Sequence, residues 1–346
     1  MSRSQGQRQA TARTAVLGAG SWGCTLAWLM GHAGRPVALW SHQPAKASLL
    51  ARRRRLNHPL RVELPPAVQI FADLEQALQE AEIILFCCNS QSMRELAARV
   101  APLVGAGATG DGFRRPVLVS TAKGLELDTL CRMSEVLRQT VPDLPVCALS
   151  GPNLAAEIVK GYPAASVIAT GDAGVAAFVQ QQLSVPTFRV YSNSDIIGVE
   201  LGGTLKNVIA IAAGASDGLN LGANARAALL TRGLAEMTRL ACALGAHGST
   251  LSGLSGMGDL FATCSSPLSR NYRLGKAMAG GLSREEARRT IGATTEGIPT
   301  TEAVCRLSNR LGIDLPIAEQ VEATLKGKNT PKGAIMSLMS RPLASE

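Results

Sequence analysis

The feature that most constrains the fold is a change in the pattern of expected strands and helices near residue 195. Before it, short β-rich runs alternate with helical patterns, whereas after it strand signals nearly vanish. Alternating strands and helices of this length are typical of a doubly wound parallel sheet with helices on both faces. We therefore predict an α/β, Rossmann-like part over residues 14–194 and an all-helical part over residues 195–346. A mobile basic tail is expected at residues 1–13.

The β-rich runs of the first part are four to six residues long. They predict strands at 14–17, 37–40, 68–71, 82–87, 116–121, 146–149, 165–169 and 187–191. The segments between them predict helices at 21–33, 45–56, 74–79, 91–100, 129–140 and 174–183. In the second part, Ala-, Leu- and Gly-rich segments predict helices at 196–215, 223–244, 270–279, 284–291, 301–311, 317–326 and 332–340.

Composition excludes several classes of protein. The 346 residues are 46% hydrophobic, which is too apolar for a disordered chain. No uninterrupted apolar run approaches the ~18–20 residues of a membrane span, so we expect no transmembrane segment. The net charge of +9 raises the question of nucleic acid, but seven of these charges sit on Arg3, Arg8, Arg13 and Arg52–Arg55. With only twelve aromatic residues to stack on bases, we expect no nucleic-acid partner.

Cysteine and histidine usage points to a reducing compartment and to a site without metal. None of the eight cysteines forms a Cys-x-x-Cys pair, and most lie in apolar surroundings, as buried free thiols do. The first residues lack the apolar core of a secretory signal, so we expect a cytoplasmic protein. The four histidines are scattered without metal-ligand spacing, and we predict no metal site.

A glycine-rich turn follows the first predicted strand and opens the first predicted helix. It reads Gly18-Ala-Gly20-Ser-Trp-Gly23, the spacing of a dinucleotide-binding turn. Gly18 permits the tight turn, Gly20 lets the backbone approach a pyrophosphate, and Gly23 allows close helix–strand packing. Free N–H groups at the start of the helix then attract the phosphates. The alternative is a turn with fortuitous glycines.

The end of the second predicted strand bears on the choice between NAD(H) and NADP(H). An acidic residue there would bind the ribose 2′-hydroxyl, but the chain has Trp40-Ser41-His42, and residues 24–62 contain no acid. A 2′-phosphate would meet no repulsion, so we expect NADP(H) to be tolerated. Arg52–Arg55 are either a solvated helix end or a direct contact to that phosphate.

Two lysines are candidates for the chemistry of a carbonyl reduction, which needs a proton donor. Lys123 follows a buried strand, at the edge of the sheet where open α/β folds bind ligands. Lys206 lies inside the apolar helix that opens the second part, where a buried charge is costly unless it has a use. Gly202 and Gly203, one turn earlier, are expected to leave a slot beside its ammonium group. The alternative for both lysines is a side chain that snorkels to solvent.

Two further segments carry polar groups suited to a substrate pocket. Residues 255–260 read as a loop that exposes the carboxylate of Asp259, which could orient Lys206 and set its pKa, or else cap a helix. Ser269 can cap the helix that follows it, and Arg270 with the free N–H groups of that helix would then bind a phosphate. A solvent-exposed arginine is the alternative.

At this point the motifs resemble those of bacterial NAD(P)-dependent glycerol-3-phosphate dehydrogenase, over about residues 14–340. The most specific stretch is RVYSNSDIIGVELGGTLKNVIAIAAG at 189–214. The resemblance also rests on GAGSWG at 18–23, STAKGLE at 120–126, LSGPNLAAE at 149–157, GANARAALLTRGLAEM at 222–237, GMGDLFATC at 256–264, SRN at 269–271 and TTEG at 294–297.

The resemblance implies reduction of dihydroxyacetone phosphate to sn-glycerol 3-phosphate for glycerophospholipid synthesis. It also implies a helical part of the 6-phosphogluconate dehydrogenase C-terminal type. Lys206 would be the proton donor and acceptor. Substrate contacts would come from Lys123, Gly151, Asn153, Asp259, Ser269, Arg270 and Asn271. Cofactor contacts would come from Gly18, Gly20, Ser21, Trp22, Gly23, His42, Lys123, Ala155, Arg270, Thr294 and Glu296.

Two departures and two rival functions are open at this stage. Asn153 stands where the family usually has Ser or Thr, and Ser41-His42-Gln43 leaves the adenosine contacts undefined. Another dehydrogenase of the same plan, for hydroxy acids or hydroxyacyl groups, is the nearest rival. A non-catalytic NADPH sensor is the other. A homodimer is compatible with the glycine-rich helical part.

Overall fold

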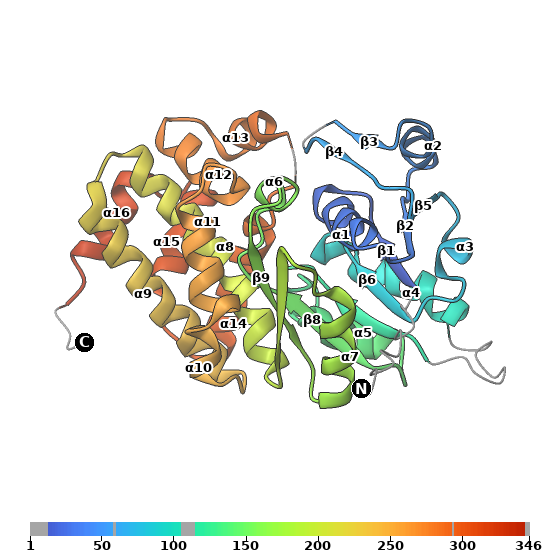
Figure 1. Ribbon diagram of the computed structural model, residues 1–346. Helices are drawn as coiled ribbons and strands as arrows, with labels where there is room; N and C mark the ends of the chain where they lie inside the picture. Colours follow the sequence, from blue (N-terminus) through green and yellow to red (C-terminus); the bar gives the residue numbers. More distant parts are fainter. Residues whose placement is uncertain (1–12, 58–59, 105–114, 293, 343–346) are drawn as a thin grey trace, which may run out of the picture.

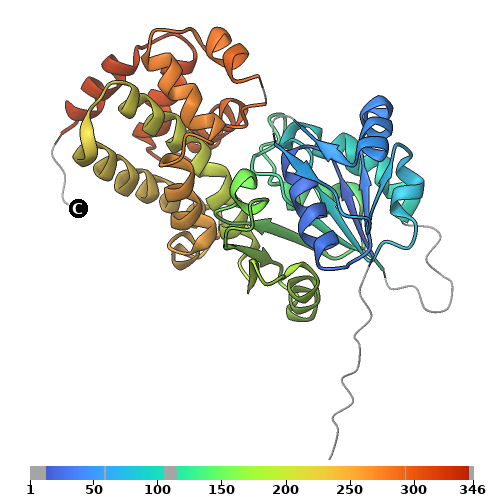
Figure 2. The same cartoon turned by 45° about the horizontal axis from the view of Figure 1, so that its top comes forward.

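The computed structural model describes residues 13–57, 60–104, 115–292 and 294–342. These residues form two lobes that lie side by side (Figure 1). We call the elements up to Asn193 the sheet lobe and those from Ile196 onward the helical lobe. The two lobes are also distinct in a second view (Figure 2). This arrangement confirms the predicted fold class, a Rossmann-like sheet followed by a helical part.

One eight-stranded sheet forms the sheet lobe, in the order β10-β9-β8-β7-β6-β1-β2-β5. Its strands are β1 (Thr14–Leu17), β2 (Val37–Trp40), β5 (Val68–Phe71), β6 (Ile83–Phe86), β7 (Val117–Ser120), β8 (Val146–Ser150), β9 (Ala164–Ala169) and β10 (Phe188–Asn193). Strand β1 pairs in parallel with both β2 and β6, so the strand order reverses at β1. The carboxyl ends of β1, β2, β6, β7 and β8 therefore meet at one edge, where such folds bind ligands.

The far edge of the sheet departs from the predicted parallel arrangement. Strand β9 runs antiparallel to β8, and β10 follows β9 in parallel. The link from β8 to β9 holds only the one-turn helix α6 (Ala155–Ile158), which the sequence patterns did not predict. The chain therefore returns beside β8 in the opposite direction, without a full crossover helix of the βαβ type.

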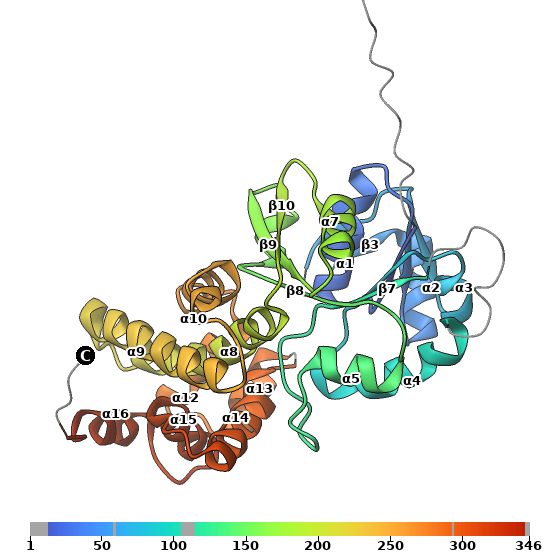
Figure 3. The same cartoon turned by 90° about the horizontal axis from the view of Figure 1, so that it is seen from below.

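Helices cover both faces of the sheet, as a doubly wound fold requires (Figure 3). One face packs against α1 (Ser21–His32), α2 (Pro44–Arg53), α6 and α7 (Ala173–Leu183). The other face packs against α3 (Leu74–Leu78), α4 (Met93–Val104) and α5 (Met133–Thr140). A 3₁₀ turn, η1 (Ser90–Ser92), precedes α4. Strands β1, β2, β6, β7 and β8 are buried along their whole length, which explains why they read as near-continuous apolar runs.

Two helices of the sheet lobe, α2 and α5, are shorter at one end than predicted, by three and four residues. The helix predicted at 45–56 ends at Arg53, because Arg54 takes a left-handed conformation with φ 51°. The chain then forms a small hairpin of β3 (Arg55–Leu56) and β4 (Val62–Glu63), which was not predicted. The helix predicted at 129–140 begins at Met133, because Arg132 is engaged in a bridge with Leu125.

The helical lobe is built around α8 (Ile196–Gly218), whose residues are mostly buried. Helix α12 crosses α8 with the two backbones in contact: a Cβ on Gly214 would lie 1.9 Å from Tyr272 O, and one on Gly275 would lie 1.8 Å from Ile211 O. The other elements are α9 (Gly222–Ala243), α10 (Gly248–Leu251), the π-helical turn η2 (Leu254–Gly258), α11 (Asp259–Cys264), α12 (Arg270–Ala279), α13 (Arg284–Ile291), α14 (Gly297–Leu311), α15 (Pro316–Leu325) and α16 (Pro331–Met339).

Helix α8 is the helix of the described residues that is long and apolar enough to cross a membrane, by length and composition alone. Its most apolar window is 83% buried inside the protein, as in the core helix of a globular domain.

Of the predicted basic tail, only Arg13 lies within the described residues. Its carbonyl oxygen accepts a hydrogen bond from Glu82 N at 3.0 Å, and its guanidinium group lies 3.6 Å from the Glu80 carboxylate. Arg13 is therefore held against the sheet lobe, and the other twelve residues of the predicted tail lie outside the described ranges.

Candidate active site

The glycine-rich turn lies between β1 and α1, beside the end of β6. Gly18 has φ +127°, and a Cβ there would meet Cys87 O at 2.6 Å. A Cβ on Gly23 would lie 1.9 Å from Gly18 O, so this position packs the helix against the turn. A Cβ on Gly20 would have no atom within 4 Å, because this glycine faces open space. The shape fits a pyrophosphate that approaches the backbone at Gly20.

The first turn of α1 is suited to bind an anion. Its N-cap residue, Gly20, offers no side-chain oxygen, so the N–H groups of the first turn have no side-chain cap. Such groups together with the helix dipole attract phosphate. Ser21 and Trp22 are half-buried at this turn, and the Trp22 ring packs against Phe188 with centroids 6.4 Å apart.

The end of β2 shows which basic residues are available near the adenosine side. Ser41 is buried and its hydroxyl oxygen accepts a hydrogen bond from Gln43 N at 3.3 Å, whereas His42 is exposed. The guanidinium group of Arg54 donates to the carbonyl oxygens of Leu64, Pro65 and Val68. These hydrogen bonds hold it against the segment that follows the hairpin. Of the four consecutive arginines, Arg52, Arg53 and Arg55 are exposed.

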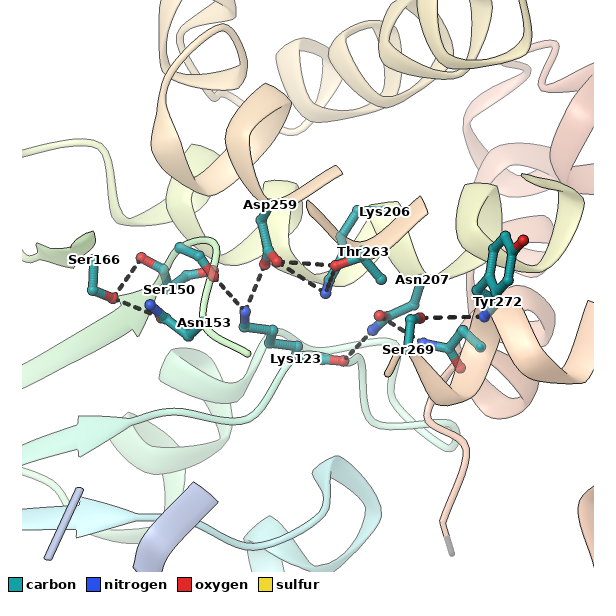
Figure 4. Close-up of polar contacts among 12 residues, drawn as sticks. Lys123, Ser150, Asn153, Ser166, Lys206, Asn207, Asp259, Thr263, Ser269 and Tyr272 are labelled. Carbon is teal, nitrogen blue, oxygen red and sulfur yellow. Dashed lines mark hydrogen bonds and ion pairs between the residues drawn. The ribbon is translucent and has the colours of Figure 1, made fainter. Parts of the chain in front are cut away.

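Lys123 and Lys206 lie on either side of one carboxylate (Figure 4). The ammonium nitrogen of Lys123 lies 2.6 Å from Asp259 Oδ2, and that of Lys206 lies 3.0 Å from Asp259 Oδ1. Lys123 also donates to Gly151 O at 2.9 Å, and Lys206 donates to Thr263 Oγ1 at 2.6 Å. We call these four side chains, Lys123, Lys206, Asp259 and Thr263, the lysine centre. It joins the carboxyl edge of the sheet to the helical lobe.

Two expectations about this centre need correction. Asp259 is 2% exposed and begins α11 directly after the π-helical turn, so it neither sits in a loop nor exposes its carboxylate. Gly202 and Gly203 leave no open slot, because a Cβ on Gly202 would lie 2.6 Å from Ser255 O and one on Gly203 would lie 2.3 Å from Ser150 Oγ. The two glycines instead let α8 pack closely enough to bring Lys206 to Asp259.

The surroundings change the proton affinity of Lys206. Burial lowers the pKa of Lys206 from 10.5 to about 8, the negative charge of Asp259 opposes this shift, and the positive charge of Lys123 adds to it. The charge of the buried Lys206 ammonium group is balanced by a single carboxylate, that of Asp259, which also pairs with Lys123. Lys206 is therefore a group that can hold or release a proton near neutral pH.

The segment after β8 contributes backbone and amide groups next to Lys123. Gly151 has φ +155°, and its carbonyl oxygen is the one that accepts from Lys123. The side chain of Asn153 donates to Ala165 O at 3.0 Å, and its amide oxygen lies 3.0 Å from Ser166 Oγ. The Asn153 side chain thus ties this segment to β9. Ala155 begins α6 and packs against the core of the sheet lobe.

The residues predicted to bind the substrate phosphate lie at the start of α12. Ser269 caps the helix, since its hydroxyl oxygen accepts from Tyr272 N at 3.2 Å. The side chain of Asn271 is committed on both sides: it donates to Asn207 Oδ1 at 2.8 Å and accepts from Gly297 N at 3.0 Å. Arg270 is exposed and donates to Thr294 O, which connects α12 to the start of α14.

Glu296 connects the helical lobe to the sheet lobe. Its carboxylate accepts from Ser90 N at 3.2 Å and from Ser90 Oγ at 2.6 Å. Thr294 is exposed next to it. Both residues therefore lie where the two lobes meet, on the same side as Arg270.

Sequence reasoning missed three residues that the structure places in or beside the site. Thr263 bonds both Lys206 and Asp259, Asn207 donates to Lys123 O at 3.1 Å, and Ser90 holds Glu296. Thr263 stands four residues after Asp259, which puts both on one helix face, but the segment read as a loop. Asn207 directly follows Lys206, and that adjacency was the available signal.

The described residues contain no group of three or more His, Cys, Asp or Glu side chains that could hold a metal ion. A Rossmann-like sheet with a glycine-rich dinucleotide turn, and with a lysine at its carboxyl edge that shares a carboxylate with a buried lysine of the helical lobe, defines an NAD(P)-dependent dehydrogenase of the two-lobed type.

Comparisons with known proteins agree with that class and narrow it. The family models for the N-terminus and the C-terminus of NAD-dependent glycerol-3-phosphate dehydrogenase match residues 13–176 and 195–336. A glycerol-3-phosphate dehydrogenase [NAD(P)+] from Geobacter sulfurreducens is 43% identical over 96% of this chain and 98% of its own length. The corresponding protein from Nitratidesulfovibrio vulgaris is 42% identical over 96% of this chain and all of its own.

A solved structure shows the same fold. The crystal structure of glycerol-3-phosphate dehydrogenase from Coxiella burnetii superposes with a TM-score of 0.90 at 36% identity, covering 96% of this chain and 99% of its own. The chain belongs to the NAD-dependent glycerol-3-phosphate dehydrogenase family.

Proposed function

We propose that this protein reduces dihydroxyacetone phosphate to sn-glycerol 3-phosphate with NAD(P)H, in the cytoplasm, and so supplies the backbone of glycerophospholipids. Membership of the family supports the reaction. The observation that carries the proposal is the lysine centre: a buried lysine with a pKa of about 8, linked through Asp259 to a second lysine at the carboxyl edge of the sheet.

Lys206 moves the proton in this proposal. NAD(P)H, when bound at the glycine-rich turn, supplies the hydride. The protonated ammonium group of Lys206 donates its proton to the oxygen on C2 of the ketone, and in the reverse direction the neutral amine accepts it. The positive charge of Lys123 stabilises the negative oxygen as it forms. Asp259 and Thr263 hold the Lys206 nitrogen in place through the contacts of 3.0 Å and 2.6 Å.

The start of α12 anchors the substrate phosphate in this proposal. Ser269 and Asn271 have committed their side chains to the protein, so their contribution is to fix the backbone of the first turn. The N–H groups of that turn and the remaining donors of Arg270 then face the phosphate. Substrate contacts from Gly151 and Asn153 belong to the same proposal, at the end of β8.

The cofactor lies along the carboxyl edge of the sheet in this proposal. Gly18, Gly20, Ser21, Trp22 and Gly23 hold its pyrophosphate, and the exposed His42 lies on the adenosine side. Contacts also come from Lys123, Ala155, Arg270, Thr294 and Glu296. The absence of acidic residues from 24 to 62 supports use of NADPH as well as NADH, because nothing there repels a 2′-phosphate.

A spectrophotometric assay tests the reaction. Dihydroxyacetone phosphate added to protein and NADPH should cause loss of the absorbance of the reduced nicotinamide, and repeating the assay with NADH settles cofactor preference. Unphosphorylated dihydroxyacetone is the matched control and should react far more slowly. Oxidation with a 2-keto acid or an acetoacetyl thioester instead would favour the rival dehydrogenases. NADPH binding without turnover of any of these would favour a sensor.

We propose a homodimer as the state in solution. Exposed apolar side chains on the helical lobe, at Leu221, Met336 and Met339, support this proposal. Sedimentation velocity should give twice the mass of the chain, and a monomer at the concentrations used for the assay would contradict it.

A further inference from the structure

A second buried charge in α8 lies away from the lysine centre. All residues of α8 are described, and its buried charged side chains are Lys206 and Glu200, each 7% exposed. The Glu200 side chain extends from the helical lobe, and its carboxylate contacts the start of α5 in the sheet lobe. It accepts from Ser134 N at 2.7 Å, from Ser134 Oγ at 2.6 Å, and from the Arg132 guanidinium group at 2.6 Å.

Arg132 connects this contact to the segment that carries Lys123. The chain from β7 to α5 leaves the sheet at Lys123 and returns through Arg132, and it closes on itself where Leu125 pairs with Arg132. Glu126 N donates to Cys131 O at 3.0 Å and strengthens the same closure. A group that holds Arg132 therefore also holds a backbone position two residues from Lys123.

The other end of the connection is α8 itself. Lys206 and Asn207 follow Glu200 by six and seven residues, which is ~9–10 Å along a helix with a rise of 1.5 Å per residue. Asn207 donates to the carbonyl oxygen of Lys123, and Asp259 bridges the two ammonium groups. The segment from Lys123 to Arg132 and the turns of α8 from Glu200 to Asn207 are thus fastened at both ends.

The buried Glu200 carboxylate indicates that this contact fixes the position of α8 relative to the sheet lobe. An apolar contact would stabilise the lobe interface without the cost of desolvating a charge. Burial raises the pKa of Glu200, while the positive charge of Arg132 and the hydrogen bonds from Ser134 oppose this shift. A carboxylate with three donors has one orientation, whereas apolar side chains slide with little penalty. Rotation or translation of α8 against the sheet would separate Lys206 from Lys123.

We propose that Glu200 is a positioning residue for the proton transfer. Together with Arg132 it clamps α8 to the segment that carries Lys123, so that the two ammonium groups stay on opposite oxygens of Asp259. The proposal rests on the function proposed above and adds a residue to it that touches neither substrate nor cofactor.

The chain offers a matched control for the experiment. Glu236 is a buried glutamate inside α9 whose carboxylate caps the start of α15, where it accepts from Ile317 N at 2.7 Å and from Ala318 N at 3.3 Å. Both partners of Glu236 belong to the helical lobe. Glu236→Gln therefore changes the same chemical group within one lobe, whereas Glu200→Gln changes it between the lobes.

The test compares kcat, KM and the solvent deuterium isotope effect in the two variants. Glu200→Gln should lower kcat by about 10-fold or more, because a misplacement of about 1 Å can lower the rate by up to about 100-fold. Its KM for NADPH should stay within about twofold of the wild type, because the glycine-rich turn is untouched. Its solvent isotope effect on kcat should rise, because proton transfer becomes more rate-limiting. Glu236→Gln should lower the melting temperature but leave all three at wild-type values.

Three outcomes decide the proposal. If wild-type protein turns over dihydroxyacetone phosphate and Glu200→Gln retains its kcat and isotope effect, the clamp has no part in alignment and the proposal is overturned. If wild-type protein shows no turnover, the function proposed above fails instead. Should Glu200→Gln not fold, Ser134→Ala removes only one of the three donors, and it should lower kcat several-fold with the same rise in isotope effect; an unchanged kcat there overturns the proposal.

Discussion

The glycine-rich turn and the lysine centre are assembled in opposite ways. The turn is made by six consecutive residues, and its demands are steric: a positive φ at Gly18 and a helix packed against the turn at Gly23. The lysine centre joins side chains in direct contact that are up to 136 positions apart in the sequence, and its demands are electrostatic. The first is a local backbone shape, and the second exists only when the two lobes are in register.

This difference separates what each region contributes to the reaction. The turn can hold a pyrophosphate whatever the exact placement of the helical lobe, because its groups are backbone N–H groups of α1. Proton transfer depends on the 3.0 Å contact of Lys206 with Asp259 inside the helical lobe and on the 2.6 Å contact of Asp259 with Lys123 across the lobe interface. Damage to the turn should therefore appear in cofactor binding, and damage to the centre should appear in kcat.

The largest effect is expected at the lysine centre. Lys206→Met should lower kcat by about 10³-fold, because it removes the group that gives and takes the proton. NADPH affinity, measured by isothermal titration calorimetry, should stay within about twofold of the wild type. Turnover at the wild-type rate would show that another residue transfers the proton.

Two alanine variants probe the glycine-rich turn separately. Gly23→Ala should weaken NADPH binding by about 100-fold and lower the melting temperature, because its Cβ would lie 1.9 Å from Gly18 O. Gly20→Ala should weaken binding about 10-fold without a change in melting temperature, since its Cβ has open space in the protein alone. Equal melting temperatures for both variants would contradict the different roles assigned to the two glycines.

The phosphate anchor should affect substrate binding more than turnover. Arg270→Ala should raise the KM for dihydroxyacetone phosphate by about 10- to 100-fold, the range of a lost charge-assisted hydrogen bond of about 1.5–3 kcal/mol. At saturating NADPH, the rate with unphosphorylated dihydroxyacetone should fall far less than the rate with the phosphorylated ketone. A KM equal to that of the wild type would remove Arg270 from the phosphate site.

The smallest effect is expected at the departure from the family pattern. Asn153→Ser restores the residue type that the family usually has, and it gives up the tie to Ala165 O. We expect kcat and KM within about threefold of the wild type, with a small loss of melting temperature. A change of tenfold or more would mean that the amide of Asn153 makes a substrate contact that a serine hydroxyl cannot replace.

The same difference explains how far the sequence could be read. Strands β1 and β2 were predicted to the residue, because buried parallel strands are short apolar runs bounded by turns, and the bounds of the half-buried β5 were predicted as well. The hairpin of β3 and β4 was missed because Arg54, with a left-handed backbone, interrupts what reads as one helix. Helix α11 was missed because Gly256 and Gly258 precede it in a π-helical turn, so the burial of Asp259 was missed too.

The residue types of the lysine centre were predictable, but their contacts were not. Lys206 was conspicuous as a charge in an apolar helix, and Asp259 as an acid among glycines. That one carboxylate would bridge two lysines depends on how α8 packs at Gly202 and Gly203, which is decided by Ser255 and Ser150 in distant segments. Glu200 lay inside the most specific motif and still gave no local sign of its partner in α5.

The pH dependence of kcat/KM tests the central claim, that buried Lys206 transfers the proton, most directly. For oxidation of glycerol 3-phosphate Lys206 must be neutral, so kcat/KM should rise with pH through about 8 and then level off. For reduction of dihydroxyacetone phosphate Lys206 must carry its proton, so kcat/KM should fall through the same pH. Profiles without an ionisation near pH 8, or with one that persists in Lys206→Met, would contradict the account.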